Sequence, residues 1–512
     1  MPPNTNPPQP DQAPPEHESK GLKAGSVNFW DGVAIGVDST APAYTIAAVL
    51  GSIAILAGTK APAVLLISFI PMLFIAGAFY YMNRADPDCG TTFSWVTRAM
   101  GPWFGWMGGW AIFSTGVLVI GAQADVAAKY LFVLLNLDSL ADNRVAVVVF
   151  ACLLVLALTW LCVRGTEMSA KFQRIMVAVQ VGALLLFVVV ALGRVITGNL
   201  ETEGSSFSLD WFNPVGLSGS ALISGMLLGV FCYWGWESAV NLNEESEDSL
   251  DAPGRAGVVS TIILLFVYLG SAVAILAIMS LTELEEYDDD EALFGVVGDL
   301  VLGPFGWLLV LSIIISGLAS TQTTILPASR GSLSMAVFGA FPDKFKEVHP
   351  SYGTPAFGTW VIGIAAIVWY VLGSLISQNF LFDSLSALSI VVAFYYALTG
   401  IACAIYWRKE LRRSLKGLLF VGVAPVIGAI VLAVLLVAAV REYADPATSY
   451  SGEAILGVGP PLFMAVLIFV LGVIAMFISR ATFAKRYFER RGGEEVDKAV
   501  ALAALGPAAP GQ

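Results

Sequence analysis

Long apolar stretches, separated by short polar segments, recur along most of this 512-residue chain. A helix needs about 20 mainly apolar residues to cross the hydrocarbon core of a bilayer. Twelve stretches reach that length, so the pattern predicts an all-α membrane protein with twelve transmembrane helices. The predicted spans are 28–57, 62–82, 103–135, 145–163, 170–193, 219–243, 256–281, 302–330, 356–377, 381–407, 416–440 and 459–480.

Two of these stretches contain the same kind of polar phrase, in which a glycine is followed two residues later by a carboxylate and then a serine: Gly36–Ser39 and Gly235–Ser238. An acid at the centre of a membrane helix costs about 2.5–3.5 kcal/mol on insertion scales, so it persists mainly beside a partner or a water-filled cavity. We therefore expect Asp38 and Glu237 to mark a functional site.

The first span is predicted to be two half-helices. Pro42 has no amide N–H and clashes with the preceding turn of a continuous helix. The residues just before it, Asp38, Ser39 and Thr40, are types that cap helix N-termini. The predicted break therefore runs from Val37 through Ala41 to the proline.

The sixth span carries a second interruption of different composition. Gly229 and Gly235 bracket a cluster of aromatic side chains, which are Phe231, Tyr233, Trp234 and Trp236. Glu237 follows where a second half-helix would begin, and the helix dipole favours an acid at that end.

Interrupted apolar segments at matching positions in two halves are typical of a secondary transporter built from inverted repeats. Backbone left unpaired at the breaks must line a cavity, which would hold the substrate near the membrane midplane. The predicted organisation is a cytoplasmic tail over 1–24, a transport core over 25–410 with repeats at about 28–193 and 219–407, two further helices over 411–482, and a tail over 483–512.

A simpler interpretation of the same residues stays open. Asp38 and Glu237 can serve only as caps that satisfy the free amides of their half-helices. The aromatic run can likewise be ordinary packing, because aromatic residues are frequent in membrane helices.

The positions of the 27 Lys and Arg residues predict the orientation. If the spans alternate, five cations fall on one side and all others on the opposite side, where cytoplasmic loops carry the excess. The five are Lys60, Lys129, Arg144, Arg194 and Arg441. We therefore expect a multi-pass protein of the cytoplasmic membrane with both termini in the cytoplasm. Residues 1–20, rich in Pro, Asn and Gln, lack the apolar core of a cleavable signal peptide and predict a disordered tail.

Composition limits the chemistry. The chain is 57% hydrophobic and 13% charged, with a mean hydropathy of +0.77, and its cations form no basic stripe that would fit a nucleic acid. Two histidines and five scattered cysteines leave no catalytic or metal-binding constellation, so we expect neither an enzyme nor a cofactor. The acidic run 283–291 is interpreted as a solvated loop. The oligomeric state stays open.

Taken with the breaks, three further stretches give the chain a resemblance to the amino acid–polyamine–organocation superfamily of transporters. The stretch 90–110, rich in Gly and Trp, resembles the loop between helices 2 and 3 of that superfamily, and Asn243–Glu245 followed by Pro253 and Arg255 resembles its Glu-Glu signature. The third, which resembles the end of its helix 8, comprises Ser329, Arg330, Met335, Ala336, Gly339 and Pro342.

The resemblance implies a five-plus-five inverted repeat with broken helices 1 and 6 and appended helices 11 and 12. It also implies carriage of amino acids or related amines by alternating access. The substrate's carboxylate and amino group would then meet exposed backbone at 37–42 and 231–235, and a carboxylate suits helix N-termini.

The chain departs from the superfamily's pattern at Asp38, because the first break of amino acid carriers is usually uncharged. A similar Asp in related sodium symporters of monoamines binds the amine, so Asp38 is predicted either to hold a cationic amine or to be protonated in the cycle. Glu237 is predicted to cap its half-helix.

A second departure concerns ion coupling. Proton-coupled members carry a Lys in helix 5, where this chain has Gln180, which cannot titrate. Ser320 and Thr321 resemble a hydroxyl pair that helps to bind sodium, and the carbonyls of Ala34 and Val37 would face them. Alternatively, both hydroxyls bond back to their own helix.

The leading hypothesis is a secondary carrier of amino acids or amines, coupled to sodium or protons. An uncoupled exchanger or uniporter is the alternative within transport, and a substrate-binding membrane sensor without flux is the alternative from another class. Ser114, Thr115 and Gln123 are further candidates for the pocket, with helix packing as their alternative role.

Overall fold

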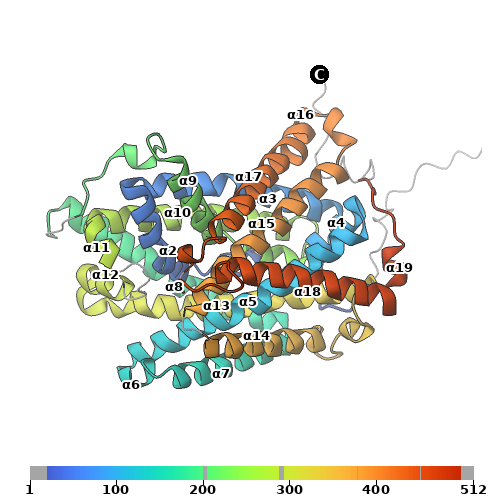
Figure 1. The fold of residues 1–512 in the computed structure, drawn as a ribbon, viewed down its shortest axis with the longest axis horizontal. Helices are drawn as coiled ribbons and strands as arrows, with labels where there is room; N and C mark the ends of the chain where they lie inside the picture. The colour runs from blue at the N-terminus through green and yellow to red at the C-terminus, as the bar shows by residue number, and fades with distance from the viewer. Residues whose placement is uncertain (1–19, 200–203, 287–292, 377–378, 450, 497–512) are drawn as a thin grey trace, which may run out of the picture.

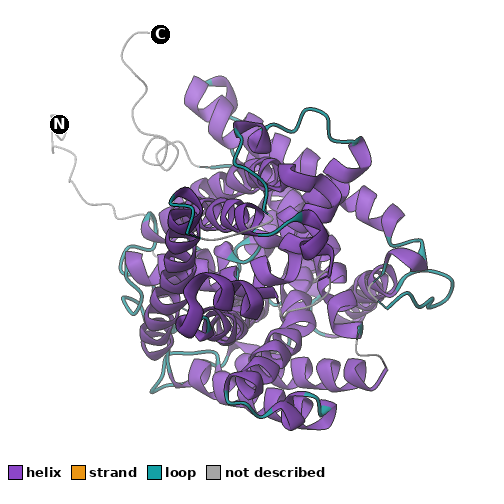
Figure 2. Ribbon diagram, turned by 90° about the vertical axis from the view of Figure 1, so that its left-hand side faces the viewer, coloured by secondary structure: helices purple, strands orange, loops and turns teal. Residues whose placement is uncertain are grey.

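The computed structural model describes residues 20–199, 204–286, 293–376, 379–449 and 451–496. Every regular element among them is a helix, and β-structure is confined to two isolated bridges, Val27 with Ser246 and Ile455 with Val458 (Figure 2). The fold is therefore all-α, as predicted.

Eleven stretches of the described chain are long and apolar enough to cross a membrane. The first, Phe29–Ala85, contains three helices, α1 (Phe29–Ser39), α2 (Pro42–Ala57) and α3 (Ala61–Ala85). The other long helices are α5 (Pro102–Leu134), α7 (Arg144–Arg164), α8 (Thr166–Ile196), α9 (Gly219–Cys232) with η3 (Trp236–Glu245), α10 (Ala252–Ile278), α13 (Trp307–Val337), α14 (Ala356–Ile376), α15 (Phe380–Tyr406), α17 (Ala424–Glu442) and α18 (Pro460–Thr482).

Short helices connect these spans. They are α4 (Thr92–Met100), α6 (Asp138–Ala141), α11 (Leu281–Glu286), α12 (Leu293–Leu302), α16 (Leu415–Gly417), α19 (Lys485–Phe488), η1 (Gly58–Lys60), η2 (Leu209–Phe212), η4 (Gly303–Phe305), η5 (Asp343–Lys346), η6 (Glu410–Arg412), η7 (Leu418–Val423) and η8 (Pro446–Thr448). The acidic run predicted to be a loop is helical where it overlaps α11, because Glu283 accepts from the amide of Ser280 (2.7 Å) at the start of that helix; residues 287–291 lie outside the described residues.

The long helices form a bundle around α5 and α13. These two helices pack along one another, and most of α13 is buried, while α7 and α14 lie side by side at one edge (Figure 1). Outward faces of α7, α8, α17 and α18 carry exposed apolar side chains. Apolar surface on that scale fits a hydrocarbon environment, since soluble monomers rarely expose it.

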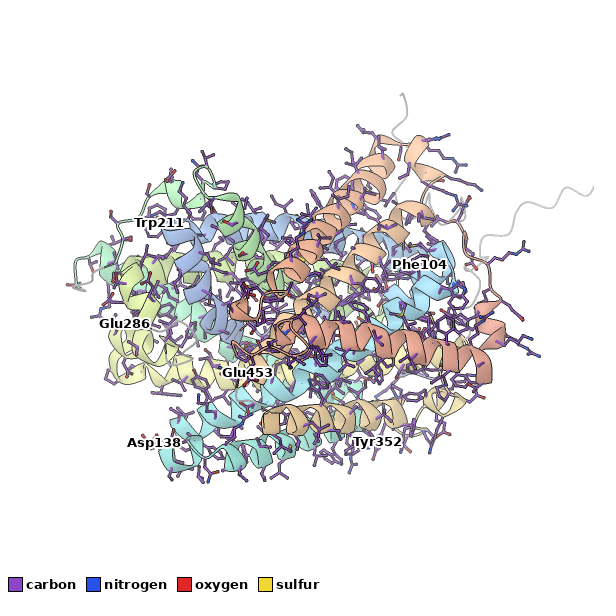
Figure 3. The ribbon with its side chains drawn as sticks, viewed as in Figure 1. Phe104, Asp138, Trp211, Glu286, Tyr352 and Glu453 are labelled. Atoms are coloured by element: carbon purple, nitrogen blue, oxygen red, sulfur yellow. The ribbon has the colours of Figure 1, made fainter. Side chains whose placement is uncertain are left out.

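The connections gather at two ends of the bundle. Asp138 and Glu286 lie toward one end, and Phe104 and Tyr352 toward the other (Figure 3). Both described chain termini pack at the second end, where Lys20 contacts Asp88 and the C-terminal segment binds α4 through the amide of Gly493, which donates to the Arg98 carbonyl (2.9 Å).

The predicted tails are partly packed. Residues 1–19 and 497–512 lie outside the described residues, but the side chain of Lys20 is only 7% exposed, and Leu22, Tyr487 and Phe488 are buried. The Tyr487 hydroxyl donates to the Pro102 carbonyl at 2.9 Å. Packing therefore extends into both predicted tails.

The first predicted break is present, but its capping differs from the prediction. Asp38 and Ser39 complete the last turn of α1, Thr40 is its C-cap, and α2 begins after Ala41. Ala41 adopts the left-handed conformation (φ 49°) and no side chain caps α2. The expectation that Asp38, Ser39 and Thr40 cap the second half-helix is wrong, because the chain turns only at Ala41, which leaves Asp38 and Ser39 in α1 and Thr40 as the C-cap of α1.

The second predicted break is also present. α9 ends at Cys232, and η3 begins directly after Gly235, whose φ is 118°. A side chain at position 235 would strain that conformation, and its Cβ would lie 2.6 Å from the carbonyl oxygen of Ser39. Glycine is therefore required both by the turn and by the close approach of the two breaks.

Candidate functional site

The two breaks meet at the centre of the bundle. The hydroxyls of Ser39 and Ser238 are 2.7 Å apart, which links the end of α1 to the first turn of η3. From α13, Ser320 donates to the carbonyl of Ser39 (2.9 Å), and from α5, Gln123 donates to the Ser320 hydroxyl (2.6 Å). Four segments distant in sequence thus converge on one polar cluster.

A small cavity adjoins this cluster. It is lined by Ser39, Ile112, Thr115, Trp234, Glu237, Ser238, Asn241, Thr324, Pro327 and Tyr395. Seven of these ten side chains carry a hydroxyl, amide or carboxylate, and none is a cation. The lining comes from α1, α5, η3, α13, α15 and the turn between α9 and η3, so the cavity lies where both interrupted helices and their neighbours meet.

Glu237 is the acid that lines this cavity, and the protein holds it in three ways. Its Oε2 accepts from the amide of Gly235 (3.1 Å), and the hydroxyls of Tyr395 and Tyr396 on α15 donate to the carboxylate. Tyr395 accepts in turn from the indole of Trp234 (2.6 Å). The carboxylate therefore joins the second break to α15.

Asp38 points elsewhere. It is completely buried, accepts a hydrogen bond from Gln180 on α8, and is not among the cavity-lining residues. Asp38 Oδ2 and Gln180 Oε1 have no hydrogen-bond partner among the described residues. The neighbouring residue Ser39 reaches the cavity because successive helical side chains point about 100° apart, as the 3.6-residue turn requires. Gln180, which the resemblance aligns with the coupling Lys of proton-coupled relatives, therefore partners the acid of the first break.

The aromatic run divides among three environments. Trp234 lines the central cavity, while the ring of Tyr233 packs against Phe69 and Tyr268 with centroids 5.6 and 5.2 Å away. Trp236 is buried against Phe79 and Tyr396, with centroids 5.1 and 5.7 Å away. Of the four predicted aromatics, these observations bring only Trp234 to the cavity.

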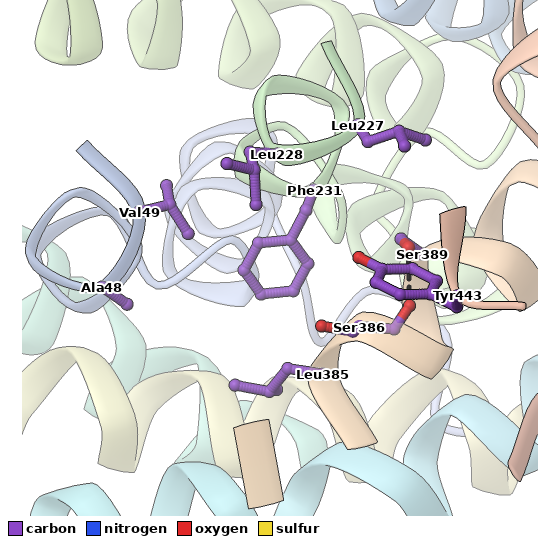
Figure 4. A pocket seen from close by; sticks show the side chains of 9 residues that line it. All are labelled: Ala48, Val49, Leu227, Leu228, Phe231, Leu385, Ser386, Ser389 and Tyr443. Carbon is purple, nitrogen blue, oxygen red and sulfur yellow. Dashed lines mark hydrogen bonds between the residues drawn. The ribbon is translucent and has the colours of Figure 1, made fainter. Parts of the chain in front are cut away.

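Phe231 lies in a separate, mainly apolar pocket (Figure 4). Its other lining residues are Ala48, Val49, Leu227, Leu228, Leu385, Ser386, Ser389 and Tyr443. These belong to α2, α9 and α15 and to the residue after α17, so Phe231 stands between α2 and α15 on the α9 side of the break.

The predicted cation ligands are mostly committed to other bonds. Thr321 donates back to the Gly317 carbonyl (2.7 Å), as the alternative interpretation held, and Ser320 is bonded across to α1. The Val37 carbonyl accepts from both the amide and the hydroxyl of Thr40, at 3.2 and 2.7 Å. Ala34 is buried one turn before Asp38 in α1.

Of the other pocket candidates, Thr115 lines the cavity while its hydroxyl bonds back to Ile112 (2.7 Å), and Ser114 bonds back to Trp110 (2.8 Å). Sequence reasoning did not find Tyr395 and Tyr396, Asn241 or Thr324. The adjacent tyrosines in the predicted span 381–407 were a visible signal, but which helix face they occupy depends on tertiary packing.

A second cluster of buried charge closes the end of the bundle that holds both chain termini. Arg330 of α13 and Glu245 of η3 are fully buried and paired through two contacts of 2.9 and 3.0 Å. Thr166 at the start of α8 donates to the same carboxylate and accepts from Arg330 (2.9 Å). Full pairing of this kind offsets the desolvation of both ions.

A second ion pair, formed by Lys20, lies beside the pair of Arg330 and Glu245. Its ammonium lies 2.9 Å from Asp88 and 2.5 Å from Glu244, and its side chain is 7% exposed. Burial opposes both charges, yet the Lys20 ammonium lowers the pKa of Asp88 to about 2, and Asp88, Cys89 and Glu244 raise the pKa of Lys20 above its usual range. The N-terminal segment is thus ionically bound to η3 and to the loop after α3.

Comparison with known proteins agrees with the geometry. A family model described as amino acid permease matches residues 29–451. The chain is 27% identical to a methylthioribose transporter of Bacillus subtilis over 60% of its own length and 68% of the relative's. It is 25% identical to a branched-chain amino acid permease of Lactococcus lactis, over 64% and 70% of the two lengths. It is also 25% identical to a low-affinity putrescine importer of Escherichia coli, over 68% and 74%.

Proposed function

Because this chain belongs to the amino acid permease family, within the amino acid–polyamine–organocation superfamily, we propose that it is a secondary active transporter of an amino acid or related amine. The observation that carries the proposal is the meeting of two interrupted helices, α1/α2 and α9/η3, at one polar cavity. Irregular backbone at membrane depth is tolerated where it lines such a cavity.

We propose that the transport core is a five-plus-five inverted repeat. Each half begins with an interrupted helix: α1/α2 leads α3, α5, α7 and α8, and α9/η3 leads α10, α13, α14 and α15. With α17 and α18 this makes twelve spans, because the apolar stretch Phe29–Ala85 holds one interrupted helix and one continuous helix. Alternating access would then rock one part of the bundle around the fixed cavity.

We propose that the protein resides in the cytoplasmic membrane with both termini in the cytoplasm. The end of the bundle that binds both chain ends carries Arg408, Lys409 and Arg98, all paired with Glu494 or Glu495 of the C-terminal segment. The excess of Lys and Arg at that end supports the orientation under the positive-inside rule.

Asp38 is proposed as the residue that takes the coupling ion, while Glu237 faces the substrate. Asp38 is buried beside Gln180 and outside the cavity lining, and its free oxygen Oδ2 can accept a proton or contact a sodium ion. An inward-moving cation gains about 2.3 kcal/mol per 100 mV of membrane potential. This arrangement would let ion binding alter α1 without competing for the substrate's position.

Uptake by the purified full chain in proteoliposomes tests the proposed function. Labelled leucine, lysine, putrescine and methylthioribose would be offered with and without sodium and pH gradients. We expect saturable uptake of at least one compound above that of protein-free liposomes. A compound that raises the melting temperature of the protein without being taken up would favour the sensor alternative and contradict the proposal.

A further inference from the structure

We propose that the substrate is a small amine without a free carboxylate, bound with its ammonium toward Glu237 and Asn241. This inference rests on the transport function proposed above and narrows the substrate of the same cavity. It follows from where the hydrogen-bond donors and acceptors of the two breaks are directed.

One backbone donor of the second break and two hydroxyl donors from α15 are already used by the protein. Exposed amides at the start of a helix ordinarily form a site for an anion. Here the amide of Gly235 donates to Glu237 Oε2, and the two tyrosine hydroxyls from α15 donate to the same carboxylate. The carboxylate of Glu237 therefore occupies three donors that a substrate carboxylate could otherwise have used.

The first break offers few donors as well. α2 begins with Pro42, which has no N–H, and the amide of Tyr44 donates to the Ser316 hydroxyl (3.3 Å). The amide of Ala41 donates to the Asp38 carbonyl (3.0 Å). Three backbone positions around the start of α2 therefore have no free N–H group that could bind a substrate carboxylate.

Acceptors, by contrast, remain free in the cavity lining. Asn241 is fully buried, and its amide nitrogen donates to the Cys89 carbonyl (3.2 Å) and to Thr91 (3.0 Å), which fixes its orientation. Its Oδ1 has no partner among the described residues, and the same is true of the Thr324 hydroxyl. Both residues line the cavity.

The charge of the lining has one sign. Glu237 is its single ionisable carboxylate, and none of the ten lining residues is a cation. A substrate carboxylate would be repelled by Glu237 without a compensating positive charge, and low local dielectric strengthens that repulsion. An ammonium would instead be attracted to Glu237, would donate to Asn241 Oδ1, and could lie against the ring of Trp234.

The remaining walls indicate the rest of the substrate. Ile112, Pro327 and the Trp234 ring present apolar surface to the cavity. A short alkyl chain attached to the ammonium would contact these surfaces. Short primary monoamines and diamines have this chemistry.

Matched pairs of compounds test the inference on the unaltered full chain. Each pair is an amino acid and the amine left when its carboxylate is removed: ornithine with putrescine, lysine with cadaverine, and leucine with isoamylamine. The measurement is how strongly each unlabelled compound, at equal concentration, reduces uptake into proteoliposomes of a labelled compound that the protein transports. We expect the amine of a pair to compete at least tenfold more strongly than its amino acid.

The outcomes separate this inference from the proposed function. If the amino acids compete as well as or better than their amines, transport stands and the amine assignment is wrong. If no member of any pair is taken up or competes, while other compounds are transported, the amine assignment is likewise wrong. If nothing is transported at all, the transport proposal itself fails.

A variant locates the effect. Glu237→Gln keeps hydrogen-bonding capacity but removes the charge, so it should reduce the preference for each amine over its amino acid by about tenfold, a loss of about 1.4 kcal/mol. Glu347→Gln removes an exposed carboxylate outside the cavity and should leave the preference unchanged. An unchanged preference in Glu237→Gln would overturn the role of Glu237, and the wild-type comparison stands even if that variant is unstable.

Discussion

The protein buries charge in two regions that are built in opposite ways. At the end that holds both chain termini, Glu245 faces Arg330 and Asp88 faces Lys20, so each anion has a cation. At the breaks, Asp38 and Glu237 face only amide and hydroxyl donors. An opposite charge offsets desolvation better than neutral donors do. The acids of the first region are therefore neutralised by cations of the protein itself, whereas the acids at the breaks would be neutralised by an incoming cation.

The largest expected effect is at the paired end. Arg330→Ala leaves Glu245 buried without its cation, and removing one partner of a buried ion pair costs about 3–5 kcal/mol. We expect a much lower yield of folded protein and a lower melting temperature, measured by size-exclusion chromatography after heating. Arg330 lies outside the cavity lining, so the defect should appear in stability first.

A matched arginine provides the control. Arg255 forms an ion pair with Asp251 at 3.2 Å, but its side chain is 60% exposed. Exposed pairs contribute about 0–1 kcal/mol, so Arg255→Ala should leave the melting temperature nearly unchanged. Equal losses in both variants would contradict the distinction between a paired interior and a solvated surface.

The next effect concerns the geometry of the breaks. Gly235→Ala forces a side chain into the left-handed region, at about 1–2 kcal/mol, and brings its Cβ to 2.6 Å from the Ser39 carbonyl oxygen. Gly339 also has a positive φ, 79°, but nothing lies within 4 Å of a Cβ there. We expect transport to fall at least tenfold in Gly235→Ala and less than threefold in Gly339→Ala, about 1.4 and 0.7 kcal/mol respectively.

Folded protein must be compared at equal amounts in both glycine variants. The comparison tests the contact between the breaks, because both substitutions place a side chain at a positive φ but only Gly235→Ala meets a neighbouring atom. Similar transport in the two variants would mean that the close approach of Gly235 to Ser39 does not contribute to transport.

Asp38 offers a way to separate coupling from substrate binding. Asp38→Asn keeps the size of the side chain and the contact with Gln180 but removes the charge that would take an ion. We expect uphill accumulation to fall by about tenfold, or about 1.4 kcal/mol, while exchange of internal for external substrate continues. Uptake driven by an ion gradient and counterflow without a gradient measure the two activities.

Gln180→Ala serves as the companion variant, because it removes the neutral partner of Asp38 and leaves the charge. If Asp38→Asn abolished exchange as thoroughly as accumulation, Asp38 would be required for substrate movement itself, and its assignment to coupling would be wrong.

The breaks could be predicted from sequence because their causes are local. Pro42 cannot continue a helix, and Gly235 permits a φ of 118° that other residues resist. The exact turn was less predictable, because Ala41 takes the left-handed conformation, which its residue type does not favour.

The roles of the two acids could not be predicted in the same way. Whether a helical side chain meets the cavity or a neighbouring helix depends on the rotation of each helix, and apolar membrane helices carry weak amphipathic signals. Asp38 meets Gln180 from α8, and Glu237 meets two tyrosines more than 150 residues away. Sequence alone favoured Asp38 as the substrate-facing acid, whereas the structure brings Glu237 to the cavity.

The smallest expected effect is at the N-terminal ion pair. Lys20→Gln breaks the contacts with Asp88 and Glu244, but Asp88 keeps Ser334 (2.7 Å) and the Gly90 amide (2.8 Å), and Glu244 keeps the Cys89 amide (2.9 Å). If the packing of the N-terminal segment against Asp88 and Glu244 is weakened by about 1.4 kcal/mol, this segment should detach about tenfold more often. Cys89 is buried beside Lys20, so its alkylation rate, read by peptide mass spectrometry, should rise about tenfold. Lys23→Gln, which breaks an exposed contact with Glu167, is the control.

The ion pair between Lys20 and Asp88 also predicts how the stability of this end of the bundle depends on pH. The pKa of Asp88, lowered to about 2, means that its ionisation stabilises the closed end above about pH 4, the usual Asp value, and is lost as pH falls toward 2. The pKa of Lys20 is raised, so its contribution is complete below about pH 10. Alkylation of Cys89, corrected for thiolate reactivity with a model thiol, should therefore be constant from pH 5 to 8. A change in the corrected alkylation rate between pH 5 and 8 would mean that another titratable group governs the opening of this end. The contrast between acids paired with cations at this end and acids without a cation at the breaks would then no longer hold.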